Sequence, residues 1–273
     1  MSKRQDKVID RVIRMYVRKI STKEVMLVLD QLKDVTAKAT MESTEVVDAM
    51  EVPIAEIPRA KGFELSGSNA LYHTGLQAEQ YGASLDKSSA SNTFTTPCAE
   101  EIEYAKSATS VTLAHAPVGT GAAGIPYIYT LVDNATDQKF AYAAQAAADK
   151  FTFSGTTLTL PTGLASTEGG KLLVIYDYLA NDESVVTRIE NVGDKFPEMR
   201  NVLLEVIFRD VCDETLKTAG YVEIPRGKFD GNVDTDLKAD GNHPFTVKAY
   251  KEYCAPKQKL CTWYYEEPSE SND

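Results

Sequence analysis

The sequence predicts a mainly β protein, an antiparallel β-sandwich or barrel with one short helix and an inserted small, Ig-like β subdomain. Residues 202–209 alternate between two faces with a period of two, which is the pattern of a strand with one dry face. Asp-Gly pairs at 230–231 and 240–241 supply residues that tolerate positive φ in tight turns. Residues 107–182 are rich in Ala, Thr and Gly, unlike both flanks. The expected segments are a basic arm (1–24), a β domain in two parts (25–105 and 184–273) and an insertion (106–183).

The composition describes an acidic globular chain. Of its 273 residues 43% are hydrophobic, which is ordinary for a protein with a packed core. The net charge of -11 disfavours a protein that grips nucleic acid, because binding phosphates requires a basic surface. No apolar run approaches the roughly 20 residues that a membrane-spanning helix needs, and no secretory segment opens the chain. We therefore expect a soluble protein that folds in the cytoplasm and has no membrane partner.

The first 20 residues form a basic end. Apolar side chains recur there at helical spacing, which favours an amphipathic helix or an arm that becomes ordered on a neighbour. Three interpretations are open: a solvated terminal helix, an arm that docks on the acidic body of an adjacent subunit, and a tether for nucleic acid or a membrane. In the second, removing residues 1–20 would prevent assembly and leave the fold intact. The candidate interaction residues at this end are Arg11, Arg14 and Arg18.

The next segment is predicted to contain short strands and the one helix. Strands are expected at 25–32, 35–42, 52–57 and 63–65. Pro58 separates the last two, since proline is tolerated at a strand end or edge. Ser68 or Asn69 is the expected N-cap of a helix at 70–81, because short polar side chains accept hydrogen bonds from the first helical amides. Gly82 is placed to close that helix.

The insertion and the segment after it are predicted to consist of strands. Inside the insertion the expected strands are 111–114, 127–132, 139–142, 151–153, 156–160 and 171–178. The last is apolar on both faces and is therefore expected near the centre of its sheet. After the insertion the expected strands are 202–209, 221–224, 233–237 and 245–250.

Some stretches match the residue spacing of ligand-binding motifs, but none has the full motif in the structural context that it requires. Residues 119–124 have the spacing of a dinucleotide-binding loop, but an extended run follows where that loop requires a helix. The acidic residues from Asp230 lack the central glycine and the final glutamate of a calcium loop. The three histidines stand in no known catalytic context, and the four spread cysteines favour reduced thiols over disulfides or a zinc site. We expect no enzyme activity, no cofactor and no metal.

A six-residue pattern occurs twice. Residues 56–61 and 223–228 have the sequences EIPRAK and EIPRGK, which differ only at the fifth position. Chance is one interpretation, and a pair of equivalent hairpins, in which proline ends a strand and two cations form a charged corner, is the other. Against acidic neighbouring subunits such corners would fix register. The candidate interaction residues are Arg59, Lys61, Arg226 and Lys228.

Parts of the chain resemble the major tail tube proteins of long-tailed bacteriophages. The resembling stretches are 52–61 running into 66–70, 195–197 leading into the strand at 202, and 231–236 followed by 243–249. The resemblance lies within residues 25–83 and 186–265 and excludes the basic arm. It implies a sandwich or barrel of the tail-tube type that forms six-membered rings, joins its inner sheets across subunits and stacks into a tube. It also implies contacts with tape measure, terminator and sheath proteins, while DNA passes through without specific binding.

The expected function is that of a non-enzymatic tail tube subunit, located in the virion and assembled in the host cytoplasm. A loop at 43–50 and the basic arm are the expected ring-to-ring contacts. The alternative is a capsid-decorating or head-tail connector protein, which shares a β-rich profile without catalytic motifs. A third class, a hydrolase with a β-sandwich carbohydrate module, would bind sugar through Tyr176, Tyr178 or Trp263.

Overall fold

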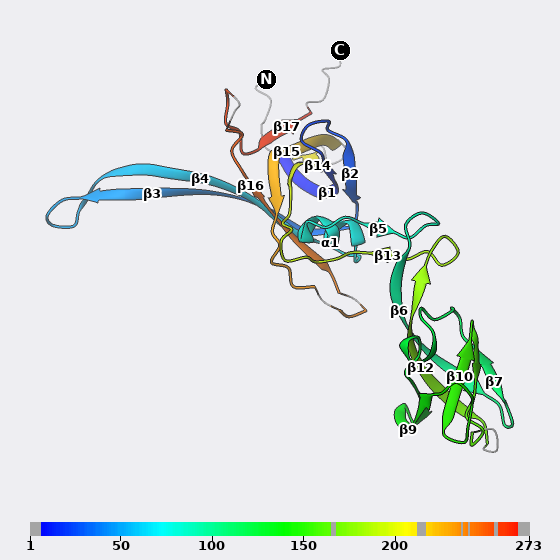
Figure 1. Cartoon of the computed structure of the whole chain (residues 1–273). Coiled ribbons are helices and arrows are strands. Elements are labelled where there is room, and N and C mark those ends of the chain that lie inside the picture. Colours follow the sequence, from blue (N-terminus) through cyan, green and yellow to red (C-terminus); the bar gives the residue numbers. More distant parts are fainter. Residues whose placement is uncertain are drawn as a thin grey trace, which may run out of the picture. The chain divides into compact units, whose positions relative to one another are not determined.

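The chain divides into two compact units in the computed structural model, which describes residues 7–164, 168–211, 217–235, 237–239, 241–253 and 256–266. The body unit comprises Met1–Leu85 and Ile189–Asp273, and the inserted unit is Asp86–Arg188 (Figure 1). Both units are built from mostly antiparallel sheets, and one short α-helix lies in the body unit. The predicted mainly β class is therefore confirmed.

One curved sheet forms the body unit. Its strands follow the order β2-β1-β14-β15-β16-β4-β3, β17 also pairs with β15, and the sheet closes almost into a barrel. The strands are β1 (Lys7–Arg18), β2 (Val25–Leu29), β3 (Leu32–Val47), β4 (Pro53–Asn69), β14 (Met199–Asp210), β15 (Lys217–Phe229), β16 (His243–Ala249) and β17 (Thr262–Tyr265).

The basic N-terminal segment is a strand inside this sheet, so the prediction of a helix or a separate arm is wrong for residues 7–18. This strand, β1, pairs with β14 on one side and β2 on the other. Its side chains Met15 and Val17 are fully buried. The register with β14 shifts after Ile9 and again after Val12. Each shift adds a residue to β1, which breaks the period of two and gives the apolar side chains a spacing that resembles a helix.

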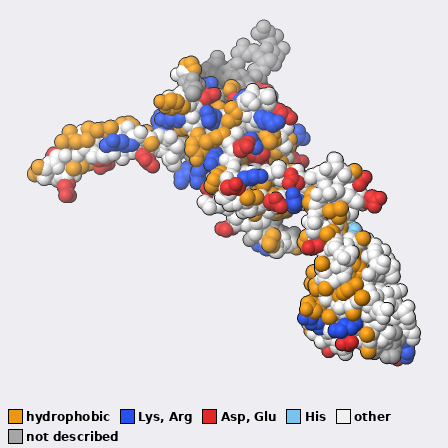
Figure 2. Space-filling model, viewed as in Figure 1, with side chains coloured by type: hydrophobic (Ala, Val, Ile, Leu, Met, Phe, Trp, Pro, Cys, Tyr) orange, Lys and Arg blue, Asp and Glu red, His pale blue; other side chains and the backbone are white. Residues whose placement is uncertain are grey.

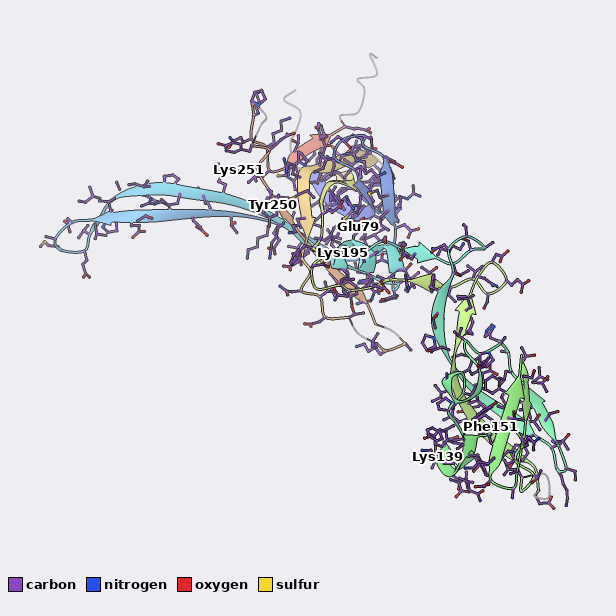
Figure 3. All side chains as sticks on the ribbon, in the orientation of Figure 1. Glu79, Lys139, Phe151, Lys195, Tyr250 and Lys251 are labelled. Atoms are coloured by element: carbon purple, nitrogen blue, oxygen red, sulfur yellow. The ribbon has the colours of Figure 1, made fainter. Side chains whose placement is uncertain are left out.

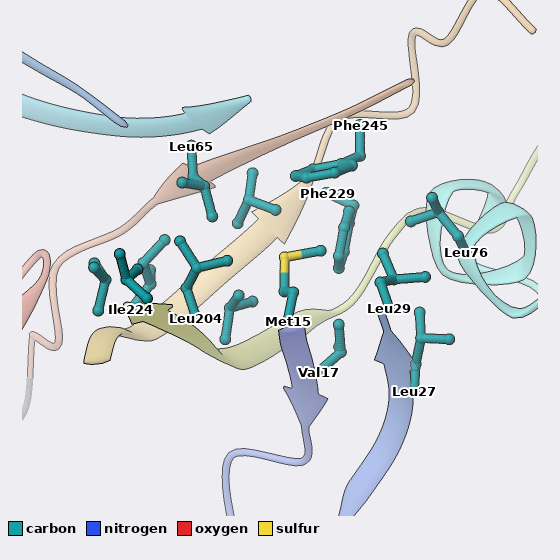
Figure 4. Packing of buried hydrophobic residues seen from close by; sticks show 14 of the residues in the cluster. Met15, Val17, Leu27, Leu29, Leu65, Leu76, Leu204, Ile224, Phe229 and Phe245 are labelled. Carbon is teal, nitrogen blue, oxygen red and sulfur yellow. The ribbon is translucent and has the colours of Figure 1, made fainter. Parts of the chain in front are cut away.

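The core of the body unit is lined by the inner face of the sheet and by helix α1 (Thr74–Tyr81) (Figure 4). Buried and more exposed side chains alternate along β14 and β15, as the sequence predicts. Fully burying one such aliphatic or aromatic side chain stabilises the fold by roughly 1.5–3 kcal/mol. The fully buried members include Met15, Val17, Leu29, Leu65, Leu76, Val202, Ile224 and Val247.

Helix α1 begins at Thr74 and is capped by His73, so the prediction of Ser68 or Asn69 as the cap is wrong. The Nδ1 atom of His73 accepts hydrogen bonds from two amides of the first helical turn (3.1 and 3.4 Å). Ser68 and Asn69 lie in β4 and pair with β16, so they continue a strand where a cap was expected. Gly82, at φ 65°, closes the helix as predicted.

A second histidine fastens the helix to β16. His243 is fully buried, and its Nδ1 accepts a hydrogen bond from the backbone amide of His73 (3.2 Å). Its Nε2 donates to Oε1 of Gln80 (2.9 Å), and Gln80 donates to the carbonyl of Pro244 (2.8 Å). Burial, and then the proximity of His73, lowers the pKa of His243. The ring is therefore held neutral, with both nitrogens in hydrogen bonds.

The inserted unit has its own sheet, in the order β6-β12-β8-β9-β10-β11-β7, and a short β5–β13 pair. The strand predicted at 171–178 is β12, which lies inside the sheet between β6 and β8, but it is second in the strand order and not central as predicted. The unit begins at Asp86 instead of residue 106, since β6 pairs with β12 along its whole length. The strands are β5 (Asp86–Lys87), β6 (Phe94–Tyr104), β7 (Ser110–Thr112), β8 (Tyr127–Val132), β9 (Ala135–Tyr142), β10 (Lys150–Ser154), β11 (Thr157–Thr159), β12 (Gly170–Ala180) and β13 (Thr187–Arg188).

Two further expectations about strands are corrected. β4 is one continuous strand, so Pro58 does not separate two strands. The described part of 233–237 is not a strand; residue 236 lies outside the described residues. A carboxylate oxygen of Asp230 accepts a hydrogen bond from the Asn232 amide (3.1 Å), and the other accepts one from Lys248 (2.6 Å). This local bonding turns the chain out of the sheet.

Replacing Met15 with Ala should destabilise the protein by about 2–5 kcal/mol, because it leaves a cavity in the core. Val8 lies on the same strand but is 53% exposed, so Val8→Ala should cost less than about 0.5 kcal/mol. Urea denaturation of both variants measures the difference. Equal stabilities would contradict a core position for β1.

The stability should fall as the pH drops below about 6.5, the ordinary pKa of a histidine in an unfolded chain. In the folded state the pKa of His243 is lower, so the unfolded state takes up a proton first and is favoured. Above that pH the stabilising effect is fully present. Denaturation midpoints between pH 7.5 and 5 should fall more steeply for the wild type than for His243→Gln. Parallel slopes would remove His243 as the cause.

Candidate assembly interface

The most exposed element of the body unit is the hairpin formed by β3 and β4 (Figure 1). Only residues 64–69 of β4 pair with β16, and residues 53–63 pair with β3 alone. An isolated two-stranded ribbon is only marginally stable in water. The predicted loop at 43–50 lies in this outer part of the hairpin, but residues 43–47 of it belong to β3 and only the rest is in the turn. The hairpin is therefore a candidate contact surface.

Apolar side chains are exposed along the outer hairpin (Figure 2). Met50 is 79% exposed and Ile54 is 68% exposed. A cluster of exposed apolar side chains on one projecting element is typical of a surface that another protein covers. The other exposed apolar residues of the hairpin are Met41, Val46, Val47, Val52 and Ile57.

The sheet of the body unit also has uncovered edges. β2 ends the strand order, and no described strand pairs with its outer edge. Its side chains Val25, Met26 and Val28 are 41–49% exposed. Beside β2 lies a groove of about 620 Å³ whose lining includes Met26, Leu85 and Phe196, the last 70% exposed. Unpaired edges with apolar side chains are sites where another strand or chain can pair.

The three arginines predicted to interact have different surroundings. Arg18 lies inside a network, where it donates to Asn201 (2.8 Å) and to Glu223 (3.0 Å). Burial raises the pKa of Glu223, but the hydrogen bond from Asn201 and the charges of Lys23 and Arg18 outweigh it and hold that pKa below its usual range. This structural role leaves Arg18 little capacity for a partner.

Arg11 and Arg14 lie on the surface of the same strand. The Arg11 side chain is 67% exposed, and its Nε lies 4.0 Å from Asp10. A hydrogen bond with Tyr16 raises the pKa of Arg14 above its usual value. Both guanidinium groups therefore remain charged and accessible, and they flank the open part of β1 that β2 does not cover.

The repeated EIPR pattern marks two β-bulges, and the prediction of two equivalent hairpins is wrong. The register of β4 against β3 shifts at Arg59, and that of β15 against β14 shifts beside Pro225. Proline has no amide hydrogen, so it fits where a bulge interrupts the ladder. Each pattern lies inside one continuous strand. The arrangement explains the repeat, which sequence reasoning assigned to strand ends.

The four cations of this pattern are placed differently. Arg59 and Lys61 are exposed on the hairpin, and Arg59 donates to Oγ1 of Thr44 (3.0 Å). Arg226 and Lys228 lie half-buried in β15, and the Nε atom of Arg226 is buried without a hydrogen-bond partner among the described residues. The structure therefore does not bring the four together. Arg59 and Lys61 are the pair available to another chain.

The tyrosines considered for sugar binding take part in hydrogen bonding and ring stacking within the protein. The hydroxyl of Tyr176 donates to Glu100, and Tyr178 stacks on His115 with ring centroids 4.0 Å apart. In the described part of the chain no group of three or more His, Cys, Asp or Glu could hold a metal ion. Cys98 and Cys261 are free thiols, while Cys212 and Cys254 lie outside the described residues. Among the described helices none is long and apolar enough to cross a membrane.

A family model decides the relationship of this chain to known proteins. The model of the YomU/Tube protein family matches residues 7–258. The chain belongs to the YomU/Tube protein family. No curated protein matches it. The family match begins at the first residue of β1, and its range includes the inserted unit of this YomU/Tube protein.

Shortening the hairpin should separate assembly from folding in this YomU/Tube protein. Residues 45–56 can be replaced by Asn-Gly, which links the paired residues Thr44 and Ile57 through a tight turn. The unfolding midpoint should stay nearly unchanged because the removed residues contribute nothing to the core. The largest assemblies detected by sedimentation velocity should be lost. An unchanged association would exclude the hairpin as the contact.

Proposed function

We propose that this protein is a non-enzymatic structural subunit of a bacteriophage tail tube. Copies form six-membered rings that stack around a channel for DNA. The observation that carries the proposal is the match to the YomU/Tube family over residues 7–258, in a chain whose sequence resembles tail tube proteins. The subunit resides in the tail of the virion after assembly in the host cytoplasm.

The open edges of the body sheet support a ring. An uncovered edge tends to pair with further strands, and a closed ring of copies covers every edge with a neighbour. The exposed apolar side chains of β2 and the adjacent groove provide the apolar contact that a stable subunit interface needs. The projecting hairpin then reaches beyond its own ring to the next one.

The charge of the chain supports a conduit for DNA. A net charge of -11 repels a polyanion, so DNA slides along such a wall without binding to it. The partners of this subunit are other copies of itself, the tape measure and terminator proteins of the tail, and the sheath where the tail is contractile. No cofactor and no membrane take part.

Negative-stain electron microscopy of the purified full chain over a range of concentrations tests this function. Rings or hollow tubes with six-fold end views are expected for the wild type, and single rings or monomers for the variant with the shortened hairpin. A wild-type chain that stays monomeric at every concentration contradicts the tube assignment. Binding of that monomer to assembled capsids would instead support a decoration protein.

A further inference from the structure

The tip of the hairpin, residues 42–57, is acidic and apolar. It contains no Lys or Arg. Two amides of the turn, those of Met50 and Val52, donate to the carboxylate of Asp48 (2.8 and 3.0 Å), which fixes the turn. No carboxylate of the tip forms an ion pair with a cation of the described chain. The acidic residues of the tip are Glu42, Glu45, Asp48, Glu51 and Glu56.

The base of the same hairpin borders a basic groove of about 310 Å³. Its cations are Arg59, Lys61 and Lys251, and the described residues that line it include no carboxylate. All three cations are exposed, and none forms an ion pair with a carboxylate of the described residues. Pro58 and Leu260 add apolar surface. Lys251 lies near the base of the hairpin (Figure 3).

The turn of the hairpin cannot reach the groove of its own copy. A strand rises about 3.3 Å per residue, so the turn of the hairpin lies on the order of 25 Å from Arg59 along β4. β3 and β4 stay paired from the base to Pro53, which keeps the ribbon extended. Figure 2 shows acidic side chains at the far end of the hairpin and basic ones nearer the body. The turn that reaches the groove must therefore come from another molecule.

We propose that the basic groove of one copy binds the acidic hairpin tip of another copy. The inference rests on the proposed function and specifies the contact between successive rings. Carboxylates of the tip pair with Arg59, Lys61 and Lys251, and exposed apolar side chains of the turn cover Leu260. Each copy contributes one tip and one groove, so the contact is heterologous and repeats along a stack.

Reversing the charge of either the tip or the groove should weaken association. Mixing the tip variant with the groove variant should restore it. The tip variant carries Glu45→Lys, Glu51→Lys and Glu56→Lys, which makes the tip positive on balance, and the groove variant carries Lys61→Glu and Lys251→Glu, which makes the groove negative on balance. Each alone should associate at least roughly tenfold more weakly than the wild type in sedimentation velocity, because like charges oppose one another. An equimolar mixture should regain the wild-type midpoint, since every tip then meets a groove of opposite charge.

The matched control reverses three exposed carboxylates of the inserted unit, Glu101→Lys, Asp137→Lys and Asp182→Lys. This control changes the net charge as much as the tip variant does and should associate like the wild type. Raising the salt concentration should weaken association of the wild type and of the mixture alike.

The outcomes separate this contact from the tube assignment itself. Tubes formed equally by the wild type and both reversed variants overturn the pairing and leave the tube function standing. A mixture that fails to regain association overturns the pairing as well. If the groove variant assembles normally but no longer binds short duplex DNA that the wild type binds, the groove is a polyanion site and the pairing is overturned. A wild type that never associates overturns both proposals.

Discussion

The body of this protein depends on the insertion of β1 between β2 and β14. Without β1, β2 would lose the one strand with which it pairs in the described chain, and β14 would lose its hydrogen bonds on one side. Met15 and Val17 reach from β1 into the centre of the core. At the end of β1, Arg18 donates hydrogen bonds to the side chains of Asn201 and Glu223. The most basic segment of this acidic chain therefore has a structural role within the fold.

Bulges let the long strands of the body curve. A bulge adds one residue to one strand and increases its twist, which a nearly closed sheet requires. The EIPR pattern supplies a residue without an amide hydrogen at two such places, in β4 and in β15. In β15 the bulge is buried within the sheet, beside Asn201. In β4 it stands where the strand has left β16, so the same residues present free cations.

The proposed assembly would explain features of the hairpin and of the sheet edge that a monomer leaves uncovered. The hairpin exposes apolar side chains on a ribbon that nothing else in the described chain supports. The edge of β2 has no partner, and the charges at the two ends of the hairpin are opposite and unpaired. By contrast, both ring nitrogens of the buried His243 form hydrogen bonds inside the body. The exposed apolar side chains, the open edge of β2 and the unpaired charges lie on surfaces that a neighbouring copy would cover in the proposed tube.

The sequence by itself determined the mainly β class, the insertion within an antiparallel body, the existence of the strand at 171–178 and the end of the helix at Gly82. Alternation, composition and turn chemistry are properties of neighbouring residues, so they can be recognised locally. It also marked Arg59 and Lys61, though not Lys251. Only the tertiary structure decided that residues 7–18 form a strand, that EIPR marks bulges and that Lys251 joins the hairpin cations in one groove. Strand partners, register shifts and shared grooves depend on residues far apart in the chain, and no local pattern records which distant segments will pair.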